Sequence, residues 1–176
     1  AKVKKVAETS KQQFRAHTIE RRYVAIVHGI LSRARTFETD LLRDRGDGLR
    51  GSWGFFRRPN SKAPPPDAQH AVTHVQPIER LRGATLVECH LETGRQHQIR
   101  IHLAEAGHML LGERVYIRDY AGEKIEAPRT MLHARTLGFA HPRSGTQVSF
   151  EREPPETLMP VTWMRVSSWR WPVRRL

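Results

Sequence analysis

The sequence predicts an α+β domain built on a mixed, mostly antiparallel β-sheet with flanking helices. Apolar segments of strand length come in neighbouring pairs joined by short turns, and they outnumber the segments with helical periodicity. A third observation is negative: no GxxxxGK loop occurs, and the one GxGxxG spacing, GDGLRG at residues 46–51, lies in a stretch that predicts a surface loop instead of a strand-to-helix turn. The sequence therefore argues against a doubly wound, nucleotide-binding fold.

Length, charge and cysteine use limit the class of protein. The chain has 176 residues, 38% of them hydrophobic, which suits one domain with its own core. Its longest apolar stretch, residues 24–31, is far shorter than the roughly 20 residues of a membrane helix, so we expect no membrane association. The single cysteine, Cys89, allows no internal disulfide, and we expect a cytoplasmic protein.

The net charge of +12 indicates a polyanionic partner, with nucleic acid favoured over a membrane surface.

The first part of the chain predicts a helix, a strand and a long loop. Residues 2–16 carry apolar side chains three and four positions apart, which is typical of a helix that packs one stripe on the core. Residues 22–27 (RYVAIV) are rich in aromatic and β-branched side chains on both faces, which favours a central strand. Residues 43–67 are rich in glycine and include three successive prolines, so they predict a surface loop.

Two hairpins follow this loop. Residues 70–79 and 84–92 read as strands joined by a turn at Arg82 and Gly83, and residues 132–140 and 146–150 form a second such pair around HPRSG. Adjacent antiparallel pairs of this kind give the predicted sheet most of its strands.

The helix predicted between the two hairpins covers residues 94–106. Thr93 can cap its start, and Gln96, three positions later, can complete a capping box. Gly107 suits the position just past its end. Polar side chains gather at the start, where the unpaired N–H groups of a helix favour an anion. They are Arg95, His97, Gln98, Arg100 and His102. The alternative is a solvated surface helix with His102 as a hydrogen-bonded core histidine.

Several blocks of the sequence resemble one known family. The segments TGRQHQIRIHL, AGHMLLGERVY and RTMLHARTLGFAHP occur in the order and register of the pattern TGRxHQIRxHLxxxGHPxxGDxxY followed by RxxLHAxxLxFxHP. Upstream, QQFRAHTIERRYVAIVHG is similar to QFxxRxxxKxYxAxVxG, and AQHAVTHVQPIE to the strand before the TGR block. Over about residues 1–155 the chain thus resembles the RluA-type family of RNA pseudouridine synthases.

The resemblance implies a pseudouridine synthase catalytic-domain fold and an enzyme that isomerises uridine to pseudouridine in rRNA or tRNA, without a metal or an organic cofactor. The target nucleotide would be flipped out of the folded RNA. By motif position, Tyr23 would lie against the flipped base, Arg100 would pair with a nucleophilic aspartate, and Leu132 would pack beneath the base. The expected RNA-binding residues are Arg95, His97, Gln98, His102 and His133.

The resemblance lacks the block that carries the aspartate. The family pattern HRLDxxTSG is absent, and none of the five aspartates has the required neighbours: Asp40, Asp44, Asp47, Asp67 and Asp119. We therefore expect residues 1–155 to be a partial catalytic domain, inactive alone, and residues 156–176 to be a basic, Trp-rich tail. Two smaller departures, Met109 for proline and Glu113 for aspartate, are expected to lie outside the chemistry.

Alternatives remain open for the function and for the tail. A non-catalytic RNA-binding module would explain the missing aspartate. A metal hydrolase is weaker, because its candidate ligands lack the spacing of a zinc motif; these are His90, His97, His102 and His108.

In the tail, tryptophans alternate with arginines and could stack on RNA bases or pack on the body. They are Trp163, Trp169 and Trp171 with Arg165, Arg170, Arg174 and Arg175.

Overall fold

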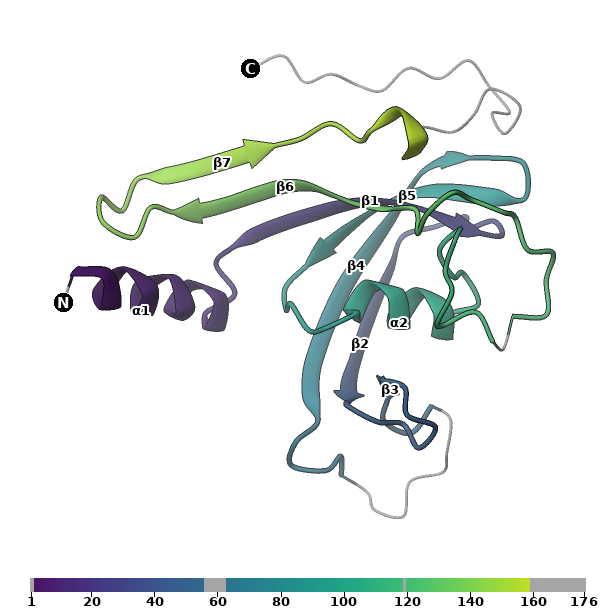
Figure 1. Cartoon of the computed structure of the whole chain (residues 1–176), viewed down its shortest axis with the longest axis horizontal. Helices are drawn as coiled ribbons and strands as arrows, with labels where there is room; N and C mark the ends of the chain where they lie inside the picture. Colours follow the sequence, from purple (N-terminus) through teal and green to yellow (C-terminus); the bar gives the residue numbers. More distant parts are fainter. Residues whose placement is uncertain (1, 56–62, 119, 159–176) are drawn as a thin grey trace.

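A computed structural model describes residues 2–55, 63–118 and 120–158 of the chain. It contains one seven-stranded sheet in the order β3-β2-β4-β5-β1-β6-β7, and every neighbouring pair is antiparallel (Figure 1). The elements are α1 (Lys2–Arg15), β1 (Glu20–His28), β2 (Arg35–Leu42), β3 (Gly51–Ser52), β4 (Gln69–Arg80), β5 (Ala84–Leu91), α2 (Gln98–Glu105), β6 (Leu132–Ala140), β7 (Gln147–Glu151) and a 3-10 turn (Glu156–Leu158). The predicted α+β class with a mostly antiparallel sheet is confirmed, but the sheet is not mixed, because no parallel pair occurs among the described strands.

Side chains of β1 reach a core cluster on each face of the sheet. Ala25 and Val27 belong to the cluster that includes Ile99 and Leu103 of α2. The intervening residues, Val24 and Ile26, belong to a second cluster. Because side chains alternate along a strand, burial on both faces requires the unbroken apolar run that predicted a central strand.

The second cluster extends to the last described residues. Leu158 is fully buried in it, so the packed body continues three residues beyond the predicted boundary at 155. The tail tryptophans lie outside the described residues. Within the part of the chain that the structure describes, no helix is long and apolar enough to cross a membrane.

Strand β2 is the element that the sequence did not reveal. It pairs with β4 along its length, from Arg35 opposite Val75 to Leu41 opposite Gln69. Its polar residues (RTFETDLL) lie on a largely solvent-exposed strand, so it lacks the alternating apolar pattern that identifies a half-buried strand. The predicted loop at 43–67 is interrupted by the two-residue strand β3, which pairs with the end of β2.

Helix α2 begins later than predicted. Its N-cap is His97, in a left-handed conformation with φ 60° and no side-chain capping bond. The proposed capping box between Thr93 and Gln96 is wrong: the Thr93 hydroxyl donates instead to Oε1 of Gln98 at 2.7 Å. At the other end Gly107 has φ 78°, and its N–H donates to the carbonyl of Ala104, as expected for a helix-terminating glycine.

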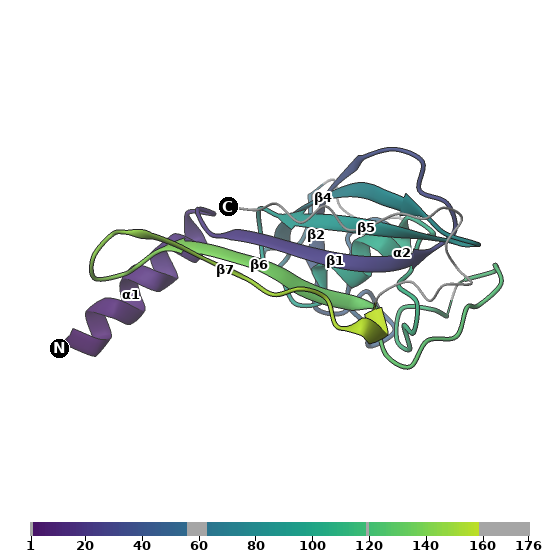
Figure 2. The same ribbon diagram turned by 90° about the horizontal axis from the view of Figure 1, so that it is seen from above.

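Helix α1 lies at one end of the molecule, beside the hairpin of β6 and β7 (Figure 2). The side chain of Gln13 bonds the backbone of Ala140 twice, at 2.8 Å to its carbonyl and 2.9 Å from its N–H. These bonds anchor the end of α1 just before the chain enters β1.

Candidate active site

Arg100 is held on α2 by a two-point ion pair with Glu113. Its Nε and Nη2 donate to the two carboxylate oxygens at 2.8 and 2.7 Å. The arginine side chain is 20% exposed and the glutamate side chain 1%. Nη1 makes no hydrogen bond to any described residue, so one edge of the guanidinium remains available for a second anion.

Glu113 is itself fixed by the backbone. Its Oε1 also accepts the N–H groups of Arg114 at 3.0 Å, Val115 at 2.8 Å and Tyr116 at 3.3 Å. Burial alone would raise the pKa of this carboxyl, but hydrogen bonds from Arg100 and the backbone bring it below its usual value. The expectation that position 113 lies outside the site is therefore wrong, because its carboxylate orients Arg100.

Tyr116 and His97 complete this corner. The Arg100 guanidinium lies over the Tyr116 ring, 5.1 Å from its centre, and the Tyr116 hydroxyl is 2.9 Å from Nδ1 of His97. Burial and the nearby Arg100 charge lower the pKa of His97, so the neutral ring predominates at neutral pH.

Gln98 and His102 are buried on the sheet side of α2. The Gln98 amide donates to Val72 and Thr73 at 2.9 Å each, and its oxygen accepts the N–H of Arg95 at 2.9 Å. His102 lies between the hydroxyls of Thr39 and Thr73, both at 2.9 Å, and burial lowers its pKa to about 4. Both side chains tie the TGR loop and α2 to the sheet. Their assignment to RNA binding stays a prediction, and in this arrangement they can only act indirectly.

Tyr23 and Leu132 lie together on the α2 side of the sheet. Both are partly buried against the cluster that contains Ile99 and Leu103, and Leu132 is paired with Ala25, two positions from Tyr23. Arg100 follows Ile99 on α2 but makes no hydrogen bond to Tyr23 among the described contacts. The catalytic assignment of the three residues stays a prediction, and Tyr23 and Leu132 share one apolar surface.

Two other predicted RNA-binding residues carry backbone contacts. Arg95 donates through Nε to the carbonyl of His70 at 2.9 Å, which leaves its terminal nitrogens without a partner among the described residues. His133 bonds through Nε2 to the carbonyl of Arg152 at 2.9 Å. Their contact with RNA stays a prediction as well.

Asp44 and Asp47 have structural partners in the loop after β2. Asp44 accepts the N–H groups of Gly46 and Gly48 at 2.6 and 3.0 Å, and Asp47 pairs with Arg45 at 2.9 Å. Asp40 lies on β2, and Asp119 is outside the described residues. Among the residues in 2–55, 63–118 and 120–158, no three His, Cys, Asp or Glu side chains come together as metal ligands, and this set includes the four histidines considered above.

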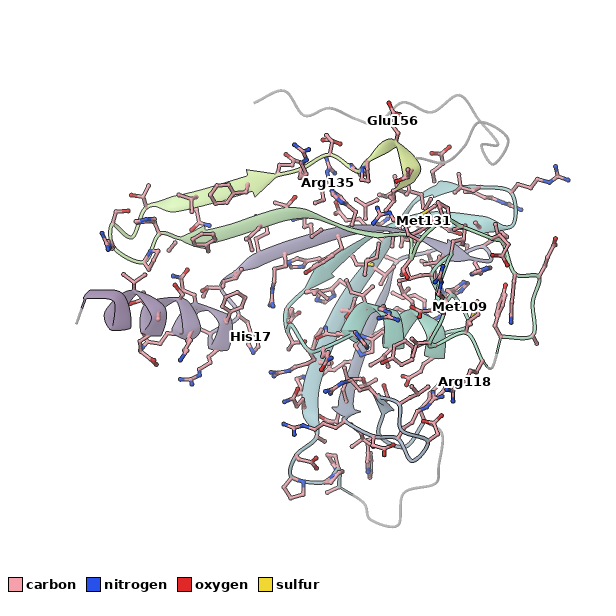
Figure 3. The ribbon with its side chains drawn as sticks, viewed as in Figure 1. His17, Met109, Arg118, Met131, Arg135 and Glu156 are labelled. Carbon is pink, nitrogen blue, oxygen red and sulfur yellow. The ribbon has the colours of Figure 1, made fainter. Side chains whose placement is uncertain are left out.

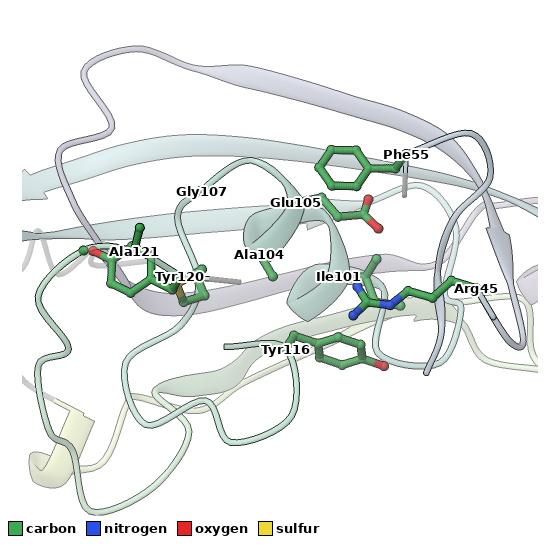
Figure 4. Close-up of a pocket in the computed structure, with 11 residues that line it drawn as sticks. Arg45, Phe55, Ile101, Ala104, Glu105, Gly107, Tyr116, Tyr120 and Ala121 are labelled. Atoms are coloured by element: carbon green, nitrogen blue, oxygen red, sulfur yellow. The ribbon is translucent and has the colours of Figure 1, made fainter. Parts of the chain in front are cut away.

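A pocket of about 370 Å³ adjoins the same corner (Figure 4). Arg45, Phe55, Glu105 and Tyr116 are among its lining residues. Burial raises the pKa of Glu105, although Ser52 donates to this carboxylate through both its N–H and its hydroxyl. Tyr116 lines this pocket and also contacts the Arg100 guanidinium, so it links the pocket to the Arg100 corner.

Comparisons with known proteins show the family to which the chain is similar. The family model described as RNA pseudouridylate synthase matches residues 1–105. A ribosomal large subunit pseudouridine synthase D of Zymomonas mobilis is 38% identical over 83% of this chain and 45% of its own length. An uncharacterized RNA pseudouridine synthase of Bacillus subtilis is 40% identical over 80% of the chain and 42% of its own length. The chain thus spans less than half the length of these relatives.

Solved structures support the fold. The human RNA pseudouridylate synthase domain containing 1 matches 85% of this chain and 60% of its own with a TM-score of 0.68, at 21% sequence identity. The human RNA pseudouridylate synthase domain containing 4 gives a TM-score of 0.63 over 86% of this chain and 64% of its own, at 20% identity.

Proposed function

Because this chain belongs to the RluA-type family of RNA pseudouridine synthases, we propose that it forms the tyrosine- and arginine-bearing part of an enzyme that isomerises uridine in RNA. In that reaction the bond between C1′ and N1 breaks, the base turns, and C1′ bonds to C5; C5 loses a proton and N1 gains one, so the product is an isomer of uridine. Relatives named for the large ribosomal subunit support the RNA of that subunit as the substrate.

The observation that carries the proposal is that only one edge of the Arg100 guanidinium is paired among the described residues. Glu113 occupies Nε and Nη2, so the side chain is fixed in orientation while Nη1 stays free for the nucleophilic aspartate expected from the family pattern. A cation at that position keeps a partly buried aspartate ionised, as a nucleophile must be.

Tyr23 and Leu132 supply the surface for the base. A uridine flipped from an RNA stack loses stacking energy of a few kcal/mol, and an aromatic ring with an apolar neighbour returns part of it. The apolar surface that these two side chains share suits that role.

Tritium release tests the proposed reaction. Large-subunit rRNA transcribed with uridine tritiated at C5 is incubated with the complete natural protein, and released tritium is counted. We expect release by the wild type, a loss of roughly 100-fold or more for Arg100→Ala, and no change for Arg82→Ala, an exposed arginine at the β4–β5 turn. RNA binding without any release would contradict the proposal and favour a non-catalytic RNA-binding module.

A further inference from the structure

A second pocket, with a basic lining, lies where α1 ends and β1 begins. It has a volume of about 240 Å³, and we call it the Arg21 pocket; it is lined by Phe14, Arg15, His17, Arg21, Gly94 and Arg95. Figure 3 shows His17 at the end of α1. No acidic side chain lines this pocket, so its charge is entirely positive.

Arg21 is buried without a counter-ion. Only 7% of the residue is exposed, its Nη2 donates to the carbonyl of Glu92 at 2.6 Å, and its Nε is buried without a hydrogen-bond partner. It forms no ion pair with any described carboxylate. A buried guanidinium in this state is costly, since both its charge and one donor are unmatched. An anion in the pocket would supply both the missing charge and a missing acceptor.

Burial is the main influence on the charge of Arg21. It lowers the pKa of Arg21, the nearby Tyr23 acts in the opposite direction, and the charge of Arg95 lowers the pKa by a smaller amount. Arg95, whose terminal nitrogens have no hydrogen-bond partner among the described residues, lines the same pocket. Arg15, by contrast, is 75% exposed and has only a 3.6 Å contact with Glu8, so it can swing toward a ligand.

Gly94 is required for this arrangement. A Cβ at position 94 would overlap Nη1 of Arg21, so only glycine lets the loop before α2 lie against the guanidinium. On the opposite side, Arg21 lies over the Phe14 ring, 5.8 Å from its centre. Phe14 is 51% exposed, and an exposed ring beside arginines suits a ribose or base attached to the bound anion.

We propose that the Arg21 pocket binds a backbone phosphate of the RNA substrate, close to the nucleotide that is modified. The proposal rests on the proposed function for the identity of the anion. Tyr23 follows Arg21 by two positions on β1, the spacing that places side chains on one face of a strand. A phosphate at Arg21 would therefore fix the strand of RNA next to the base-binding surface.

The test compares RNA binding by matched arginine variants of the complete natural protein. The probe is a large-subunit rRNA transcript, and affinity is measured by filter binding over a range of KCl concentrations. We expect Arg21→Gln to weaken binding roughly 10- to 100-fold and to reduce the slope of log affinity against log salt by about one. Arg21→Lys keeps the charge and should recover most of the affinity.

The controls distinguish a loss of RNA binding from a loss of folding, and a failure of the pocket inference from a failure of the proposed reaction. Arg82→Gln removes an equal charge at the opposite end of β5 and should change affinity little. If Arg21→Gln does not fold by circular dichroism, Arg95→Gln takes its place with the same expected change of slope. Folded pocket variants that bind like Arg82→Gln would overturn the inference, even if the wild type releases tritium. Conversely, weaker binding by these variants without tritium release by the wild type would leave the pocket standing and remove the proposed function.

Discussion

The fold gives different partners to two arginines, Arg100 on α2 and Arg21 on β1. Arg100 meets a buried carboxylate at two points, and Glu113 is in turn held by three backbone N–H groups. Arg21 is more deeply buried but has a carbonyl as its only described acceptor. We infer that an arginine paired with a carboxylate is oriented by the protein itself, whereas an arginine without a counter-ion is available to an anionic ligand. We call the first a matched and the second an unmatched arginine.

The largest expected effect on stability follows from breaking the matched pair. Glu113→Gln leaves Arg100 half-buried without its anion and should lower the free energy of unfolding by about 2–4 kcal/mol. Arg21→Gln removes an unmatched charge and should change it by less than about 1 kcal/mol. Urea denaturation at pH 7 measures both, and equal losses would erase the contrast between the two arginines.

Acid should weaken the α2 corner through His102. Its pKa is about 4 in the folded protein against 6.5 ordinarily, so the unfolded chain takes up a proton first. This contribution is complete above pH 6.5 and is lost as the pH falls toward 4, by about 3 kcal/mol in total. His102→Gln removes the titrating group. The difference in unfolding free energy between wild type and variant should thus shrink over that range, and a constant difference would show that His102 does not titrate there.

Gly94→Ala probes the unmatched arginine without removing it. The added methyl group must displace the Arg21 guanidinium, and we expect RNA affinity to fall roughly tenfold. The control is Gly145→Ala in the β6–β7 turn, where a Cβ meets nothing within 4 Å but the φ of 74° strains an alanine. This variant therefore shows what backbone strain alone does to RNA affinity when Arg21 is not displaced. If both variants bind RNA equally well, the close approach at Gly94 has no role in binding.

The smallest effect concerns free phosphate. Binding to the Arg21 pocket should raise the melting temperature in sodium phosphate by roughly 1–3 °C over sodium chloride of equal ionic strength. Arg82→Gln should show this shift in differential scanning fluorimetry and Arg21→Gln should lack it. A shift that persists in Arg21→Gln would place the anion elsewhere.

The pattern of apolar residues along the sequence was sufficient to predict most of the strands. Residues 132–140 were predicted as a strand and form β6 with those bounds, because turn residues bracket an apolar run. Strand β2 escaped prediction because its side chains are mostly polar and exposed. The capping box failed because a spacing rule cannot tell that the Gln98 side chain turns toward the loop and the sheet.

The sequence predicted site residues only where they fall in a motif of the family pattern. Arg100 was identified by its block, but Glu113 counted as a departure from the pattern until the fold placed it against Arg100, 13 positions away. Arg21 stands at the lysine position of the pattern QFxxRxxxKxYxAxVxG, but the pattern says nothing of burial or of a missing counter-ion. The glycine of TGR was the available signal, because glycine often marks close backbone approach.

The most direct test of the comparison separates binding from chemistry. Steady-state tritium release from large-subunit rRNA by the complete natural protein gives kcat and KM for wild type, Arg100→Ala and Arg21→Gln. We expect Arg100→Ala to lose kcat at nearly unchanged RNA affinity, and Arg21→Gln to raise KM while retaining most of kcat. If Arg100→Ala keeps the wild-type kcat, the guanidinium held by Glu113 has no part in the reaction.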